Sequence, residues 1–298
     1  GTVDDALAID DIKAFIAAKD LEDEHKYIPP MVSCTREPFD QKIAIIGSGP
    51  AGLSCAYFLA IEGYKPVVFE KQEMPGGMMT LGIPNFRLDK KVVNAEIEIL
   101  KAMGVEIRCG VEVGKDVTFQ SLREEGFKGF FVGTGLQACG KLGIPGDDAQ
   151  GVIGGVDYVK SVTLGKAKKL SGDVVVIGGG NIGADVARTA IRQGAKSVHL
   201  YCLESYDEMP MGEEDQEFLK NEGIVIHDGW GQTEVVTKNG KVAGIKFRKC
   251  VSVKNAEGRF DPKFDDNEST EQACRTILFS IGQMPDYGTL FEGTKVEL

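Results

Sequence analysis

Short apolar runs, each followed by a glycine-rich turn and a helical pattern, occur twice in the chain. The runs at residues 43–46 and 174–177 predict buried strands of parallel sheets. The turn glycines after them have the spacing Gly-x-Gly-x-x-Gly in both places: Gly47, Gly49 and Gly52, then Gly178, Gly180 and Gly183. These positions differ by 131 residues throughout, and so do Gly63 and Gly194, where each following helix is expected to end.

Two further correspondences extend this repeat. Residues 100–107 resemble residues 219–226 at an offset of 119, and residues 130–135 resemble residues 277–282 more loosely. The chain therefore contains two units with the same order of elements: strand, glycine-rich turn, helix, strand, a longer intervening segment and a final strand. We expect an α/β protein with two Rossmann-like dinucleotide-binding domains, each with three layers around a parallel sheet.

Three other segments have patterns of their own. Residues 234–247 alternate around Asn239-Gly240 and predict a β-hairpin. Residues 261–272 are polar and acidic, and we expect a solvated loop there in preference to a metal site. Residues 8–19 predict an amphipathic helix that needs a partner surface. Its apolar face consists of Ile9, Ile12, Phe15 and Ile16.

The two glycine-rich turns carry the clearest chemistry. The first glycine permits the tight turn, the second lets a pyrophosphate approach the backbone, and the third allows close packing of helix on strand. The helix N-terminus offers unpaired N–H groups and partial positive charge to the phosphates. The sequence therefore predicts two dinucleotide sites. Glu70 ends the second strand of the first unit, where it is either a ribose-binding carboxylate or a surface glutamate.

Composition and charge exclude several other functions. Of the 298 residues 38 are glycine, and the net charge of −11 leaves no basic footprint for nucleic acid. No apolar run reaches the roughly 18 residues of a membrane span. Seven scattered cysteines without C-x-x-C favour reduced thiols in a cytoplasmic protein over disulfides, a metal site, an internal iron–sulfur cluster or a redox-active dithiol. None of the three histidines has a catalytic pattern, so the catalytic residues stay unassigned.

A series of motifs resembles a known family. Residues 76–88 read GGMMTLGIPNFRL, which resembles the GG-x-x-x-x-GIP-x-x-RL signature of the glutamate synthase small-subunit family of FAD-dependent pyridine nucleotide oxidoreductases. The segment is also similar to the flavin modules of dihydropyrimidine dehydrogenase and of NADH-dependent ferredoxin:NADP oxidoreductase. Further matches follow in the family's order at residues 178–181, 185–190, 208–210 and 281–286. The resemblance implies that an FAD in the first unit takes hydride from NAD(P)H in the second and passes electrons to an iron–sulfur domain or subunit.

The resemblance also implies which residues contact the cofactors. For FAD they are Gly47, Ser48, Gly49, Pro50, Ala51, Gly52, Glu70, Lys71, Gly77, Met78, Gly82, Arg87, Val113, Thr134 and Gly135. For the nicotinamide nucleotide they are Gly178, Gly179, Gly180, Asn181, Ile182, Gly183, Glu204, Ile281 and Gly282. Arg87 either holds a phosphate or anchors its loop. Of the adjacent Met78 and Met79, we expect one to fill the core.

The residues at positions 203 and 204, which precede the Glu-Met-Pro at 208–210, bear on the choice between NADH and NADPH. Family members that use NADPH usually present two arginines there, but this sequence has Leu203 and Glu204. Each charge-assisted bond from arginine is worth roughly 1.5–3 kcal/mol, whereas a carboxylate suits the free 2′-hydroxyl of NADH. We therefore expect NAD(H), with NADP(H) disfavoured. The offset of 131 places Tyr201 opposite Glu70, which leaves Glu204 just past the strand.

The resemblance sets the expected domain boundaries. Residues 1–40 form a helical lead-in, a remnant of the linker to an upstream iron–sulfur segment. Residues 41–160 and 283–298 form the FAD-binding domain, in which the NAD(P)-binding domain, 161–282, is inserted. The family's upstream cysteine-rich segment, its downstream Gly-Asp segment and an initiating Met are all missing from the sequence. We expect an excised piece of a longer chain that binds FAD weakly unless the downstream segment is supplied.

Two alternative functions stay open. One is a nucleotide-binding or scaffold module without flavin turnover, and flavin absorbance that NADH bleaches would exclude it. The other is a disulfide reductase of the same architecture, which the lack of C-x-x-C disfavours. The sequence does not identify the final electron acceptor.

Overall fold

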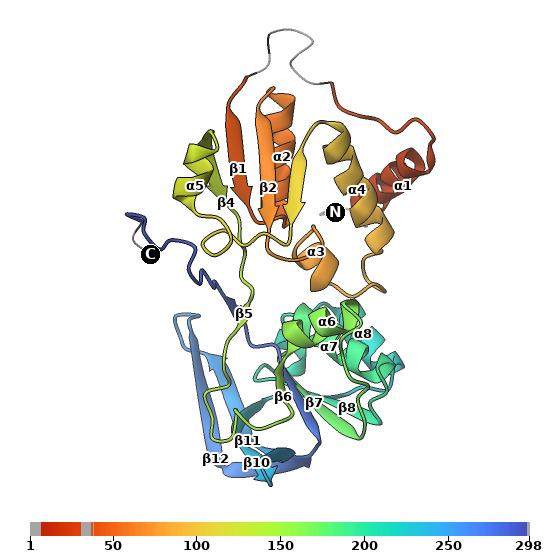
Figure 1. Cartoon of the computed structure of the whole chain (residues 1–298). Coiled ribbons are helices and arrows are strands. Elements are labelled where there is room, and N and C mark those ends of the chain that lie inside the picture. The colour runs from red at the N-terminus through yellow and green to blue at the C-terminus, as the bar shows by residue number, and fades with distance from the viewer. Residues whose placement is uncertain (1–6, 31–36, 38, 297–298) are drawn as a thin grey trace. The chain divides into compact units, whose positions relative to one another are not determined.

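The computed structural model describes residues 7–30, 37 and 39–296. Residues 1–6, 31–36 and 38 of the expected lead-in, and residues 297–298 of the expected FAD-binding domain, lie outside the described residues. The chain forms two compact units (Figure 1). The first contains Gly1–Thr80, Asn85–Gly135 and Tyr287–Leu298, and the second contains Leu81–Pro84 and Leu136–Asp286. These limits differ from the expected boundaries at residues 160 and 282, because residues 136–160 and 283–286 pack with the second unit.

A four-stranded parallel sheet forms the centre of the first unit. Its order is β3-β2-β1-β4, with β1 at Lys42–Ile46, β2 at Lys65–Glu70, β3 at Glu106–Cys109 and β4 at Phe127–Val132. Successive side chains of a strand face opposite sides, so each face buries its own cluster. One cluster joins Ile45 and Val68 to α2 (Pro50–Ile61) and α4 (Lys90–Ala102). The other joins Phe69 and Phe127 to α5 (Phe119–Glu124) and to Leu290.

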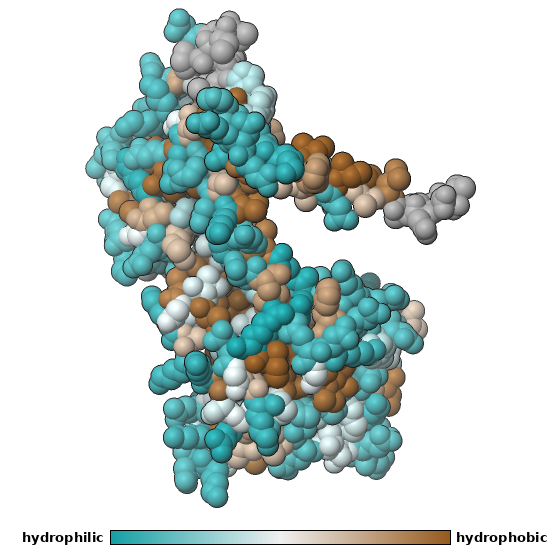
Figure 2. Space-filling model, turned by 90° about the vertical axis from the view of Figure 1, so that its right-hand side faces the viewer, coloured by the Kyte–Doolittle hydropathy of each residue, from teal (hydrophilic) through white to brown (hydrophobic). Residues whose placement is uncertain are grey.

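The expected amphipathic helix of the lead-in is α1, at Ile9–Glu22. Asp10 and Asp11 lie in its first turn and Lys19 in its last, where their charges complement the helix dipole. None of its residues is buried, and its apolar side chains are at the surface (Figure 2). The described residues therefore supply no surface that covers the apolar face of α1.

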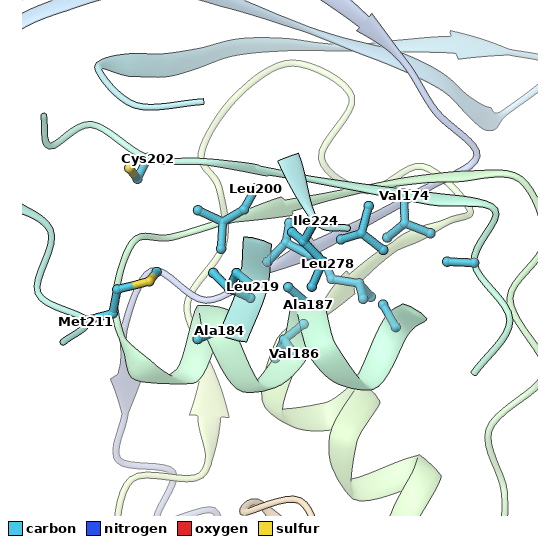
Figure 3. Packing of buried hydrophobic residues seen from close by; sticks show 14 of the residues in the cluster. Val174, Ala184, Val186, Ala187, Leu200, Cys202, Met211, Leu219, Ile224 and Leu278 are labelled. Carbon is cyan, nitrogen blue, oxygen red and sulfur yellow. The ribbon is translucent and has the colours of Figure 1, made fainter. Parts of the chain in front are cut away.

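The second unit has a five-stranded parallel sheet in the order β6-β13-β7-β8-β9. The strands are β6 (Val152–Gly154), β7 (Asp173–Ile177), β8 (Ser197–Tyr201), β9 (Val225–His227) and β13 (Thr276–Phe279). On one face lie α6 (Gly155–Thr163), α7 (Asn181–Arg192) and α8 (Glu213–Asn221), with the short 3₁₀-helix η2 at Tyr206–Glu208 before α8. Leu200 and Leu278 of the sheet pack there against Ala187 and Leu219 of the helices (Figure 3). All four side chains are almost completely buried.

A three-stranded antiparallel sheet covers the opposite face of this unit. Its strands are β10 (Trp230–Lys238), β11 (Lys241–Lys254) and β12 (Phe260–Ala273). The hairpin predicted around Asn239-Gly240 is confirmed, since β10 and β11 meet at those two residues, both of which have positive φ. The expected loop at residues 261–272 is wrong, because those residues form most of β12. This strand lies at the sheet edge and pairs only with β11, so none of its residues is buried and its sequence is polar.

Hydrogen bonds between the strands confirm the internal repeat. Gly47 N donates to Phe69 O at 2.8 Å, and Gly178 N donates to Tyr201 O at 2.9 Å. Tyr201 is therefore the equivalent of Phe69, and the residue equivalent to Glu70 is Cys202. The expected match between Tyr201 and Glu70 is wrong because β8 begins three residues after Gly194, whereas β2 begins two residues after Gly63.

The remaining elements are short. Helix α3 covers Met78–Leu81, and β5 (Ala138–Cys139) pairs with β14 (Gln283–Met284) in a two-stranded antiparallel ladder. In the part of the chain that the structure describes, no helix is both long and apolar enough to span a membrane.

Candidate functional site

The first glycine-rich turn joins β1 to α2 and is closely packed at both ends. Gly47 has a φ of +100°, and a Cβ there would lie 2.5 Å from the carbonyl oxygen of Gly133. A Cβ at Gly52 would overlap the carbonyl oxygen of Gly47. Side chains at either position would push the turn away from its neighbours, so both positions require glycine.

The middle of this turn is open instead. A Cβ at Gly49 would meet no atom within 4 Å. Gly49 is the N-cap of α2, no side chain caps the helix, and Pro50 occupies the first helical position. The first-turn N–H groups of α2 therefore have no side-chain acceptor beside an open backbone surface, which is the arrangement that a pyrophosphate requires.

Glu70 is held against this turn by Ser48. The Ser48 amide and hydroxyl donate to Oε2 of Glu70 at 3.0 and 2.7 Å, and the Gln72 amide donates to Oε1 at 2.8 Å. Glu70 is 5% exposed and Ser48 is completely buried. Each carboxylate oxygen can accept more than one hydrogen bond, so the fixed carboxylate keeps capacity for ribose hydroxyls.

The segment after β2 returns to the same turn. Gly76 N donates to Oγ of Ser48 at 3.1 Å, and a Cβ at Gly77 would lie 2.7 Å from the Cα of Gly49. Two backbone segments thus meet at a point where Gly77 leaves no room for a side chain of its own. Of the adjacent methionines, Met79 packs against the core cluster beside α2 and α4, as expected for one of the pair.

The other residues expected at the FAD site lie in different surroundings. Lys71 and Arg87 are exposed, and Thr134 and Gly135 follow the end of β4. Val113 is buried and its side chain lies in the cluster with Phe69, so that side chain is part of the core. Gly82 belongs to the second compact unit, whereas the sequence grouped it with the first.

The second glycine-rich turn has the same construction between β7 and α7. Gly178 has a φ of +127°, with a Cβ position 2.5 Å from the carbonyl oxygen of Ser280, and a Cβ at Gly183 would overlap the carbonyl oxygen of Gly178. Gly180 caps α7 without a side-chain bond and has nothing within 4 Å of its Cβ position. Asn181 and Ile182 are exposed in the first turn of α7, so the backbone at this helix N-terminus is open as well.

The charge beside the second turn comes from Glu204. A Cβ at Gly179 would lie 2.9 Å from Cβ of Cys202 and 3.2 Å from Oε2 of Glu204. Although Glu204 is three residues past the end of β8, its carboxylate therefore lies against the turn. Ile281 and Gly282 follow β13 and are exposed.

The thiols are poorly suited to nucleophilic chemistry. The six cysteines in the described residues are all free. Burial raises the pKa of Cys202 and of Cys274 to about 12, and it also raises the pKa of Cys139. Neutral thiols are weak nucleophiles, which argues against a disulfide reductase. Within the same residues, no three His, Cys, Asp or Glu side chains form a group that could hold a metal ion.

The sequence interpretation missed two contributors to these turns. Ser280 takes the place in the second unit that Gly133 has in the first: Ser280 N donates to Ile177 O at 2.7 Å and Gly133 N to Ile46 O at 2.8 Å. The match of residues 130–135 to 277–282 contained this signal. Lys249 of β11 lies beside Gly229, whose amide donates to Glu204 O, but nothing in the sequence neighbourhood of Lys249 indicates this.

Two parallel sheets, each followed by an open glycine-rich turn and a helix whose N-cap is a glycine, are the architecture of Rossmann-like domains. Comparison with family models agrees: residues 41–298 match pyridine nucleotide-disulphide oxidoreductase, and the chain belongs to that family. The expected two Rossmann-like domains and the resemblance to glutamate synthase small subunits are thereby confirmed.

Relatives in sequence are named as subunits of oxidoreductases. The NADP(+)-dependent formate dehydrogenase subunit beta of Moorella thermoacetica is 35% identical over 97% of this chain and 44% of its own length. The NADPH-Fe(3+) oxidoreductase subunit beta of Geobacter sulfurreducens is 32% identical over 99% and 44%. The glutamate synthase [NADPH] small chain of Bacillus subtilis is 31% identical over 99% and 63%. The chain thus spans less than two thirds of each of these relatives.

Solved structures share the fold. FprA from Mycobacterium tuberculosis in complex with NADPH has a TM-score of 0.71 at 19% identity, covering 82% of this chain and 71% of that one. Thioredoxin reductase from Lactococcus lactis has a TM-score of 0.61 at 22% identity, covering 85% and 80%. At these identities the likeness establishes the architecture alone.

Proposed function

We propose that this chain is the flavin-containing electron-entry unit of an oxidoreductase. A nicotinamide nucleotide binds on the turn at 178–183 and reduces an FAD bound on the turn at 47–52. The observation that carries the proposal is the pair of open, uncapped helix N-termini at Gly49 and Gly180, each framed by glycines that pack against backbone. A scaffold protein has no need of this repeated exposure of backbone amides.

The residues present fit FAD in the first unit. The turn from Gly47 to Gly52 offers backbone amides to the pyrophosphate, and the anchored carboxylate of Glu70 accepts from the ribose hydroxyls. Gly77 lets the following segment pass beside the cofactor. FAD, when bound, supplies the acceptor for hydride and the means to release electrons singly. The protein orients the cofactors and excludes water, so no acid–base residue is required.

The proposal includes a preference for NADH over NADPH. A 2′-phosphate near Glu204 is repelled by its carboxylate, whereas a free 2′-hydroxyl can donate a hydrogen bond to it. The relatives named above are described as NADP- or NADPH-dependent, so this chain would differ from them in its nucleotide.

Stopped-flow reduction of the FAD-reconstituted protein under anaerobic conditions tests both parts. We expect NADH to bleach the flavin absorbance faster than NADPH, and Glu204→Gln to narrow the difference. Faster bleaching by NADPH contradicts the nucleotide preference. A flavin that neither nucleotide bleaches contradicts the oxidoreductase and favours a nucleotide-binding module.

An iron–sulfur domain or subunit completes the proposal as the electron acceptor. The relatives are named as beta subunits or small chains, which is consistent with a unit that serves a partner. We expect the NADH-reduced protein to bleach an added iron–sulfur ferredoxin. A flavin that NADH reduces but that leaves the ferredoxin oxidised would exclude this class of acceptor.

A further inference from the structure

The loops after β8 and β9 run side by side past the ends of their strands. Trp230 N donates to Cys202 O at 2.8 Å, and Gly229 N donates to Glu204 O at 2.9 Å. Residues 202–204 and 228–230 therefore form one continuous rim next to the second glycine-rich turn. In a Rossmann-like unit this edge receives the adenosine half of the nucleotide.

Strand β11 brings a cation to the same rim. Cys250 N donates to Gly229 O at 2.8 Å, so the residue before it, Lys249, lies beside the loop. A Cβ at Gly229 would be 2.9 Å from Nζ of Lys249, which also lies 5.1 Å from the centre of the Trp230 ring. The aromatic face holds the ammonium at the rim.

The ammonium of Lys249 is available to a ligand, whereas the guanidinium of the neighbouring Arg248 is already bonded within the sheet. Arg248 is bonded to Asp266 at 3.0 Å and stacks on Phe264 at 3.9 Å. Of the ion pairs formed within the described residues, none includes Lys249 or Glu204. A cation and an anion thus face the same rim without neutralising each other by direct contact.

We propose that Lys249 is the nucleotide-specificity residue that opposes Glu204, its ammonium binding the 2′-phosphate of NADPH. The proposal rests on the proposed nicotinamide nucleotide site. Glu204 disfavours the phosphate and Lys249 attracts it, so the balance of the two charges sets the ratio of NADPH to NADH affinity. Lysine supplies a mobile point charge there, in place of the planar, two-pronged contact of an arginine.

Two ligands that differ only in the 2′-phosphate test this assignment: adenosine 2′,5′-bisphosphate and 5′-AMP, titrated calorimetrically. We expect Lys249→Met to weaken the bisphosphate about tenfold while changing 5′-AMP less than twofold. Glu204→Gln strengthens the bisphosphate, and this gain is lost in the double variant. Lys249→Arg keeps the discrimination, and Lys254→Met, at the exposed far end of β11, changes neither affinity.

Equal weakening of both ligands in Lys249→Met, or no change in either, overturns the role of Lys249. If that variant loses its folded circular dichroism spectrum, Lys249→Gln replaces it and is judged by the same criterion. A wild-type protein that binds the bisphosphate more tightly than 5′-AMP contradicts the NADH preference, while a selective loss in Lys249→Met still supports the assignment. The two proposals therefore fail separately.

Discussion

The hydroxyl of Ser48 lies 2.7 Å from the same carboxylate oxygen of Glu70 that accepts the Ser48 backbone amide. These two hydrogen bonds to one buried oxygen connect the glycine-rich turn to the end of β2. The turn and the carboxylate are consequently fixed relative to each other before a nucleotide arrives, which lowers the entropy cost of binding.

Loss of the Ser48 hydroxyl should weaken both the fold and the site. Ser48→Ala removes the hydroxyl's bond to Glu70 and one of the two acceptors of Gly76 N, which keeps the Ser48 carbonyl oxygen, and we expect urea unfolding to show a loss of about 1–3 kcal/mol. FAD affinity should fall as well. The control, Ser54→Ala, alters an exposed serine of α2 and should change stability by less than about 0.5 kcal/mol. Equal stability of the two variants would show that the bond contributes nothing.

Substitutions at two glycines of the first turn should affect different properties, one the stability of the fold and the other the binding of FAD. In Gly52→Ala the new methyl group meets the Gly47 carbonyl oxygen, and we expect a loss of about 1–3 kcal/mol or more in thermal unfolding. Gly49→Ala meets open space at an ordinary φ of −69°, so the fold should be retained. Its methyl group occupies the surface that the pyrophosphate needs, so FAD affinity should drop. Unchanged flavin binding in a folded Gly49→Ala would contradict the assigned site.

The pair of His199 and His227 should make stability depend on pH. Their ring nitrogens lie 3.0 Å apart, and burial lowers the pKa of both from the usual 6.5. Well above pH 6.5 both residues are neutral in the folded and the unfolded state. As the pH falls through 6.5 the unfolded chain gains protons that the folded chain resists, so the unfolding free energy decreases.

Denaturant unfolding at pH 7.5 and at about pH 5.5 measures this effect. His227→Phe keeps a ring against Tyr201 and removes one titrating group, so stability should fall less between the two pH values. His25→Gln, an exposed control, should keep the wild-type dependence. The same dependence in His227→Phe would show that the pair does not cause it.

The thiols should differ in reactivity. With the pKa at about 12, Cys202 and Cys274 have about one part in 10⁴ as thiolate at pH 8, so iodoacetamide should label them only after denaturation. Cys55 and Cys109 are partly exposed and should react in the native protein, though slowly, because burial raises their pKa too. Peptide mass spectrometry measures the order in which the cysteines are labelled, and rapid labelling of Cys202 in the native protein would contradict the prediction.

Much of the fold is readable from the sequence because it depends on local rules. The apolar runs at 43–46 and 174–177 are short, rich in β-branched residues and followed directly by a glycine-rich turn, which favours a buried strand over a helix. The turn at Asn239-Gly240 is predictable because few residues other than glycine and asparagine tolerate positive φ. Strand β12 escaped prediction because its hydrogen bonds, not buried side chains, hold it at the sheet edge.

The candidate sites divide in the same way. The sequence by itself determined the two glycine-rich turns and the position of Glu70, since turn geometry and strand ends follow from neighbours along the chain. Only the tertiary structure decided that Ser48 anchors Glu70, that Cys202 and not Tyr201 is its counterpart, and that Lys249 shares a rim with Glu204. Those relationships join residues on separate strands, and strand register is set by the packing of the whole sheet.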